Sequence, residues 1–167
     1  GKIIVVGVGW SIGNLASNLL LLRYTTDGIL DTTFGDNSSG YTVIEPGAKE
    51  YQPSSLLLQD DGLIMVGGFF STADNLERGM FLARFTAAGE LDTSFGENGI
   101  VEETLSSDKY SASFLLMDDV GRYIVGSSNA YFDSVAICVF SSAGEPDTTF
   151  GGTGVIYPWD DGLNFTY

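Results

Sequence analysis

Short apolar runs alternate with glycine-rich polar turns along the whole chain. Runs of this length, bounded by Gly, Asp and Asn, are typical of β-strands joined by tight turns rather than of helices. The pattern predicts strands in three related sets. The first set is residues 2–7, 19–25 and 41–44, the second is 54–59, 63–67, 80–86 and 99–103, and the third is 112–117, 122–126, 135–141 and 154–157.

A nearly identical stretch lies between the last two strands of each of the three sets. It reads Gly-Ile-Leu-Asp-Thr-Thr-Phe-Gly at 28–35, Gly-Glu-Leu-Asp-Thr-Ser-Phe-Gly at 89–96 and Gly-Glu-Pro-Asp-Thr-Thr-Phe-Gly at 144–151. We call this stretch the turn motif. The copies stand roughly sixty residues apart, and a fixed period of this kind is the mark of a repeat architecture.

Four strands per period predict an all-β fold, a β-propeller-like array of four-stranded antiparallel blades. Three copies are present, and the first lacks its innermost strand in this chain. We expect one repeat domain over 1–167, or a fragment of one. It divides into a partial blade at 1–45, complete blades at 54–104 and 112–158, and a lead-in to a next blade at 159–167.

The turn motif, preceded in each copy by a Gly-x-(Ile/Tyr)-(Ile/Met)-Val-x-Gly-like strand, resembles the bacterial delta-sixty repeat. The resemblance covers nearly the whole chain. It implies a β-propeller-like fold in secreted or cell-surface proteins, and it implies no agreed activity. The third copy departs from the pattern at two positions. One is Pro146, and the other is Val139, which stands where the other copies have Arg23 and Arg84.

The repeated residues of the turn motif have a structural interpretation. Asp in a tight turn accepts hydrogen bonds from backbone N–H groups two residues on, Phe can plug the turn onto the blade, and Gly supplies a permissive backbone. We therefore predict structural turn roles for nine residues: Asp31, Phe34, Gly35, Asp92, Phe95, Gly96, Asp147, Phe150 and Gly151. Cys138 falls in an apolar strand and is expected to be a small core residue.

Composition excludes several classes of function. The chain has 7 Lys+Arg against 22 Asp+Glu, a net charge of −15, no His and one Cys. A basic nucleic-acid binder needs clustered cations, a Cys/His zinc site needs ligands that are missing, and catalysis by a His triad is impossible. No apolar run approaches the roughly 20 residues of a membrane helix, so we expect no membrane insertion.

Function is expected on the connections that differ between copies, because loops vary while the scaffold repeats. In a four-stranded meander the second-to-third strand connections and the blade-to-blade connections share one end. The candidates for a ligand face there are Trp10, Phe70, Asp74, Tyr131, Asp133, Trp159 and Asp160. Aromatic rings stack on partners and carboxylates accept from hydroxyls, although these aromatics can equally be plugs over the blade cores.

The leading hypothesis is a non-catalytic, extracellular or cell-surface binding or adhesion module that engages a glycan or a surface protein. One alternative is a structural repeat subunit that assembles head-to-tail into a ring or filament, and another is a carboxylate-based glycoside hydrolase or lyase. No cofactor and no metal are expected, and calcium near Asp74 or Asp160 is a weak alternative. Three blades do not close a propeller, so we expect a fragment of a longer repeat protein or copies that complete one another.

Overall fold

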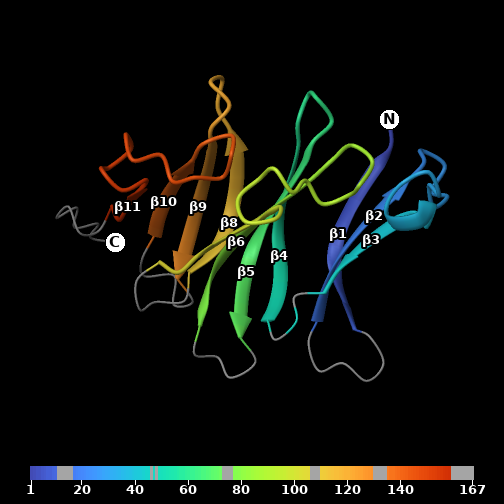
Figure 1. Cartoon of the computed structure of the whole chain (residues 1–167), viewed down its shortest axis with the longest axis horizontal. Helices are drawn as coiled ribbons and strands as arrows, with labels where there is room; N and C mark the ends of the chain where they lie inside the picture. The colour runs from blue at the N-terminus through green and yellow to red at the C-terminus, as the bar shows by residue number, and fades with distance from the viewer. Residues whose placement is uncertain are drawn as a thin grey trace, which may run out of the picture.

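The computed structural model describes most of the chain, and every structural statement below concerns that part. The described residues are 1–10, 17–45, 47, 49–72, 77–105, 110–129 and 135–158. They form a row of three antiparallel sheets that stand side by side (Figure 1).

Each sheet is a meander in which strands adjacent in sequence are paired. The first sheet contains β1 (Ile3–Trp10), β2 (Ser17–Tyr24) and β3 (Tyr41–Ile44). The second contains β4 (Lys49–Leu58), β5 (Ile64–Thr72), β6 (Arg78–Phe85) and β7 (Ile100–Glu103). The third contains β8 (Tyr110–Met117), β9 (Tyr123–Asn129), β10 (Val135–Phe140) and β11 (Val155–Ile156). A short 3-10 turn, η1 (Asp36–Ser38), precedes β3.

This architecture confirms the predicted fold class. The sheets are ordered β1-β2-β3, β4-β5-β6-β7 and β8-β9-β10-β11, and each strand pair is antiparallel. The sheet formed by β1, β2 and β3 has no strand in the described residues that corresponds to β4 or β8. The chain is therefore a propeller-like array of blades with a three-stranded first blade.

The hydrophobic core lies between the sheets rather than inside any one of them. One cluster joins the first and second sheets and includes Leu19, Phe34 and Phe81. The other joins the second and third sheets and includes Met80, Phe95 and Cys138. A blade with two apolar faces is stable only when each face is covered, so neighbouring blades stabilise one another.

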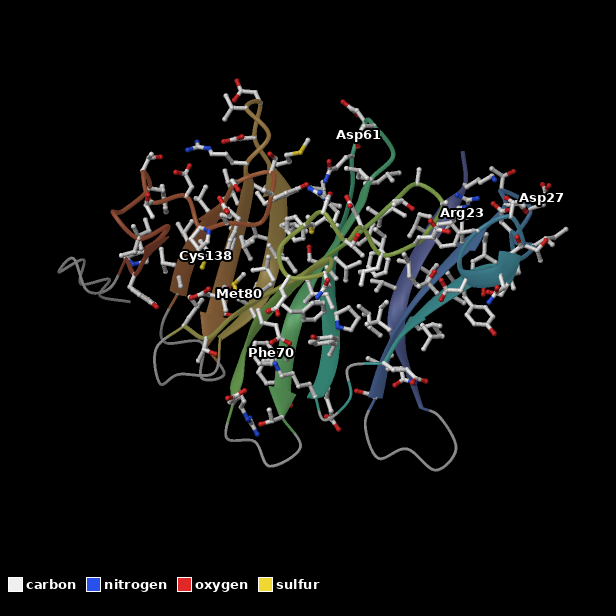
Figure 2. The ribbon with its side chains drawn as sticks, viewed as in Figure 1. Arg23, Asp27, Asp61, Phe70, Met80 and Cys138 are labelled. Carbon is white, nitrogen blue, oxygen red and sulfur yellow. The ribbon has the colours of Figure 1, made fainter. Side chains whose placement is uncertain are left out.

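The two ends of the array differ. The tight turns after β4 and β8 lie at the upper end in Figure 1, and Asp61 marks one of them in Figure 2. The strand ends that enter the dissimilar connections, including the Phe70 end of β5, lie at the lower end. We call the lower end the variable end.

Several strands run further toward the variable end than the sequence pattern predicts. β4 begins at Lys49 rather than at residue 54, and β5 continues to Thr72 rather than ending at Gly67. The extra length passes an irregularity of register between Pro53 and Ser55, where a β-bulge interrupts the alternation of side chains. The bulge lies in β4, so it explains why strict alternation along the sequence missed the start of that strand.

No described segment forms a helix that is both long and apolar enough to cross a membrane.

Candidate functional site

Most of the predicted ligand face lies outside the residues that the structure describes. Asp74, Tyr131, Asp133, Trp159 and Asp160 lie outside the described residues. The backbone of Trp10 is the last position of β1, opposite Ser17, and it therefore stands at the variable end.

Phe70 is not displayed on that face, and this part of the sequence interpretation is wrong. Its ring is 2% exposed and belongs to the core between the first two sheets. A Cβ atom placed on the neighbouring Gly79 would lie 2.8 Å from Phe70 Cε1, so the glycine leaves room for the ring. The strand continues through Phe70 and turns this side chain inward, where the sequence pattern assigned it to a loop.

A polar cluster lies above Phe70 at the variable end of the second sheet. The Tyr51 hydroxyl donates to Glu102 Oε1 at 2.6 Å, and Lys49 forms an ion pair with the same carboxylate. Lys49 Nζ also lies 5.1 Å from the centre of the Phe70 ring, a cation–π contact. The Tyr51 ring packs against Phe81 with 4.7 Å between ring centres. We call Lys49, Tyr51 and Glu102 the Glu102 cluster.

The electrostatics of this cluster keep the tyrosine neutral. Burial raises the pKa of Tyr51 far above its ordinary value, and the hydrogen bond to Glu102 and the charge of that carboxylate raise it further. Tyr51 therefore remains a hydrogen-bond donor. Burial also raises the pKa of the adjacent Glu103 carboxyl.

A groove of about 520 Å³ runs along β7 beside this cluster. Its lining residues include Glu97, Glu102, Glu103, Asn98 and Tyr51. Gly96 of the second turn motif and Gly144 and Pro146 of the third turn motif also line it. We call this feature the β7 groove. Its size lies within the range of small-ligand sites, roughly 300–1,000 Å³.

The β7 groove is suited to orienting polar groups. The side chains of Glu102 and Lys49 are 24% and 30% exposed, so their charged ends reach solvent while their stems are held by neighbours. Carboxylates are acceptors only, which makes the groove complementary to ligands rich in hydroxyl donors. The sequence pattern did not single out Lys49 or Glu102. The available signal was their place at the variable end of a strand, next to connections that were expected to carry function.

The turn motifs form a uniform network, and the second and third of them also contribute to the lining of the β7 groove. Each motif Asp accepts from the backbone N–H two residues on, at 3.2 Å for Asp31, 3.1 Å for Asp92 and 3.0 Å for Asp147. The hydroxyls of Thr33, Ser94 and Thr149 donate to the same carboxylate oxygens. These bonds lower the pKa of each of the three carboxyls, most strongly at Asp31, where Lys2 is the largest cause.

A basic side chain pairs with every motif Asp, although its origin changes. Arg23 Nε donates to Asp31 at 2.7 Å and Arg84 Nε donates to Asp92 at 2.8 Å. The third blade has Val139 in the equivalent place, and there Arg122 Nη1 reaches Asp147 at 3.0 Å from the turn between β8 and β9. The ion pair is therefore retained in the copy whose sequence departs from the pattern.

The remaining motif residues connect blades. Phe34 and Phe95 are fully buried between neighbouring sheets, whereas Phe150 is half-buried. Gly35 and Gly96 take the positive φ angles 77° and 51°, and Gly151 takes 60°. A side chain at such an angle is strained, which explains why the turn uses glycine.

Within the described part of the chain, no three side chains of Asp, Glu or Cys are grouped so that they could hold a metal ion. The calcium alternative rests on Asp74 and Asp160, which lie outside the described residues.

Comparison with known families supports the propeller architecture. Residues 1–34 and 59–95 match a family described as "Domain of unknown function (DUF5122) beta-propeller". The matched segments contain the β1–β2 hairpin with the first turn motif up to Phe34 and the β5–β6 hairpin with the second up to Phe95. A search of curated proteins found no match.

Proposed function

We propose that this chain is a non-catalytic binding module in which propeller-like blades present the β7 groove and the variable end to a glycan. The observation that supports this proposal is the β7 groove with the Glu102 cluster beside it. The uniform motif network, whose Gly96, Gly144 and Pro146 line part of the groove, supplies the rigid scaffold that such a site requires.

The ligand class follows from the chemistry of the groove lining. Glu97, Glu102 and Glu103 offer carboxylate acceptors, and Asn98 offers both an acceptor and a donor. Sugars carry many hydroxyl groups, and these donate hydrogen bonds to such acceptors. Trp10 and Trp159, from the predicted ligand face, supply candidate stacking surfaces for the flat faces of sugar rings.

A binding role is favoured over hydrolysis by how Glu102 is held. Its carboxylate is engaged by both Lys49 and Tyr51, and a group held in this way is arranged to orient a ligand rather than to shuttle a proton. Glycoside hydrolysis uses two carboxyl groups roughly 5–9.5 Å apart that take different protonation roles.

The finer family and the location belong to the same proposal. The turn motif and its spacing support membership of the delta-sixty repeat group, and that resemblance supports a secreted or cell-surface protein. A glycan ligand accords with such a location.

The test is a glycan array probed with the labelled chain, followed by titration calorimetry on any sugar that binds. Glu102→Gln and Glu97→Gln are expected to weaken binding at least about tenfold each, the equivalent of roughly 1.4 kcal/mol. Trp10→Ala and Trp159→Ala are expected to do the same through lost stacking.

The matched control is Glu90→Gln, which makes the same chemical change at an exposed position that does not line the groove. It is expected to leave affinity unchanged. An array with no binding, or binding that the groove variants and the control affect equally, would reject the proposal. A thermal melt of each variant separates loss of binding from loss of folding.

A further inference from the structure

The contact between neighbouring blades has the same parts in both places where it occurs. At the first contact, the Phe34 ring lies against the next blade's Gly89, where an added Cβ would come within 2.5 Å of the ring. Gly35 N–H donates to Ala88 O at 2.8 Å, and Arg23 Nη1 donates to Ala87 O at 2.9 Å. A phenylalanine plug therefore enters a glycine socket, with hydrogen bonds on either side.

The second contact repeats the first. Phe95 lies against Gly144 of the third blade, where an added Cβ would be 2.9 Å from the ring. Gly96 N–H donates to Ala143 O at 2.8 Å, and Arg84 donates to Ser142 O. Two occurrences with equivalent residues define a repeatable, directional contact from the plug of one blade to the socket of the next.

Among the described residues, none fills the equivalent socket of the first blade. Gly28 is equivalent to Gly89 and Gly144, yet no atom outside its chain neighbours lies within 4 Å of an added Cβ. The sheet face beside it is apolar and open. Ile3 and Val5 are 51% and 41% exposed, while their equivalents in the second blade, Ile64 and Val66, are 1% and 0% exposed. We call this surface the socket face.

The third blade carries the opposite half. Phe150 is equivalent to Phe34 and Phe95, but it is only half-buried. On the same side of the sheet Leu116 is 49% exposed, whereas its equivalent Leu57 packs against the core between the second and third blades. Ile124 and Ile137 add partly exposed apolar area. We call this surface the plug face.

We propose that the plug face of one copy docks on the socket face of a second copy of this chain. Phe150 then lies against Gly28, and Gly151 N–H donates to Asp27 O, as Gly35 does to Ala88 O and Gly96 to Ala143 O. The occupant is specified by continuity with an interface that the fold already makes twice. Charge agrees, because Asp27 replaces the alanines of the filled sockets and Arg122, with its side chain 39% exposed, pairs with Asp147 in the same turn motif as Phe150.

The two faces differ, so the contact is heterologous and leaves one of each face free in a dimer. Association then continues until a ring closes, or into a filament when the rotation does not close. This inference concerns different surfaces from the β7 groove and stands or falls separately from glycan binding.

The experiment uses sedimentation of the chain over about 1 µM to 1 mM, the range in which modest interfaces become populated. The wild-type mass is expected to rise with concentration beyond that of a dimer. Val5→Glu blocks the socket face and Leu116→Glu blocks the plug face, and both substitutions fall on exposed positions that a folded monomer tolerates. Each variant alone is expected to remain monomeric.

The decisive sample is an equimolar mixture of the two variants. The intact plug face of the Val5→Glu chain meets the intact socket face of the Leu116→Glu chain, so the mixture is expected to form a heterodimer and nothing larger. A wild-type chain that stays monomeric at every concentration overturns the proposal and leaves a further blade of the same polypeptide as the occupant. A single variant that dimerises by itself also overturns it, because that contact would join two like faces.

Discussion

Asp92 shows how one carboxylate organises a turn. It accepts from the Ser94 backbone N–H, the Ser94 hydroxyl and Arg84 Nε at 3.1, 2.7 and 2.8 Å. Arg84 is itself buried and packs over the Phe95 ring at 4.7 Å. The motif aspartate thus neutralises a buried cation at the blade-to-blade contact, which is a structural task.

Asp92→Asn is expected to lower the free energy of unfolding by about 1.5–3 kcal/mol, because a charge-assisted bond is lost and Arg84 is left buried without its partner. Chemical denaturation measures the change. Glu90→Gln, an exposed change in the same motif, is expected to stay within about 0.5 kcal/mol of wild type. Equal effects of the two substitutions would contradict the role given to Asp92.

The same pair gives a pH dependence with a definite sign. The Ser94 bonds, followed by the Arg84 contact, hold the pKa of Asp92 below its ordinary 3.8 in the folded chain. A carboxyl with a lowered folded pKa stabilises the fold fully above its unfolded pKa and loses that contribution as the pH falls through the folded value. The stability difference between wild type and Asp92→Asn is therefore expected to be constant above about pH 5 and to shrink below about pH 4. A difference that grows on acidification would contradict this assignment.

Cys138 is a second residue whose environment sets its chemistry. Burial raises the pKa of its thiol to about 12, and the charge of Glu103 adds to the shift. We expect the native chain at pH 8 to react with a disulfide reagent at least about 100-fold more slowly than the chain in denaturant, where the thiol is exposed. Rapid labelling of the native protein would show that the β10 strand is accessible.

At the level of elements, each blade depends on its neighbours. Leu19 and Leu21 of β2 are buried in the cluster that the first sheet shares with the second, and Met80 of β6 is buried in the cluster that the second sheet shares with the third. The turn motif then adds directional contacts at the outer edge of each sheet. Gly28 and Gly89 occupy equivalent turns, but only Gly89 contacts a plug. Substituting each in turn therefore distinguishes the free-energy cost of a side chain in the turn from the cost of disturbing the contact between blades.

Gly28→Ala and Gly89→Ala both place a side chain at positive φ, 77° and 90°, and so share a backbone cost of about 1–2 kcal/mol. Only at Gly89 would the new Cβ meet the Phe34 ring. Gly89→Ala is therefore expected to destabilise by a further 1–3 kcal/mol or so through overpacking. Equal melting temperatures for the two variants in dilute solution would contradict the plug-and-socket contact.

On the scale of the whole molecule, the array has two unlike faces and two unlike ends. One end carries the uniform turns and the other carries the strand ends that enter the dissimilar connections. One face carries the empty socket and the other carries the partly exposed plug. Binding at the variable end and association through the faces use separate surfaces, so they can be tested independently.

Association by the faces couples stability to concentration. A partner that binds only the folded chain stabilises it by about 2.7 kcal/mol at one hundred times the dissociation constant. For a chain of this size that corresponds to several degrees, at about 2–4 °C per kcal/mol. The wild-type melting temperature is expected to rise between dilute and concentrated samples in scanning calorimetry, while that of Leu116→Glu stays constant. A wild-type value independent of concentration would argue against the docking.

The repeat made the fold class predictable, because the turn motif and the strand pattern are local signals that recur in order. The candidate site was less predictable. Phe70 was assigned to a loop because the predicted strand ended at Gly67, whereas β5 continues through the second glycine, Gly68, to Thr72. Glu102 was missed because its partners Lys49 and Tyr51 stand 53 and 51 positions before it in the sequence.

Local chemistry along the chain determined the antiparallel strands, their order and the glycine-bearing turns. These depend on side-chain alternation and on backbone angles, and both are properties of a few neighbouring residues. Only the tertiary structure decided which strand faces were covered, that Arg122 would take the place of Val139 beside Asp147, and that Glu102 would meet Lys49 and Tyr51. Those outcomes depend on how sheets pack against each other across long separations in sequence, and packing of that kind is settled when the whole chain is folded.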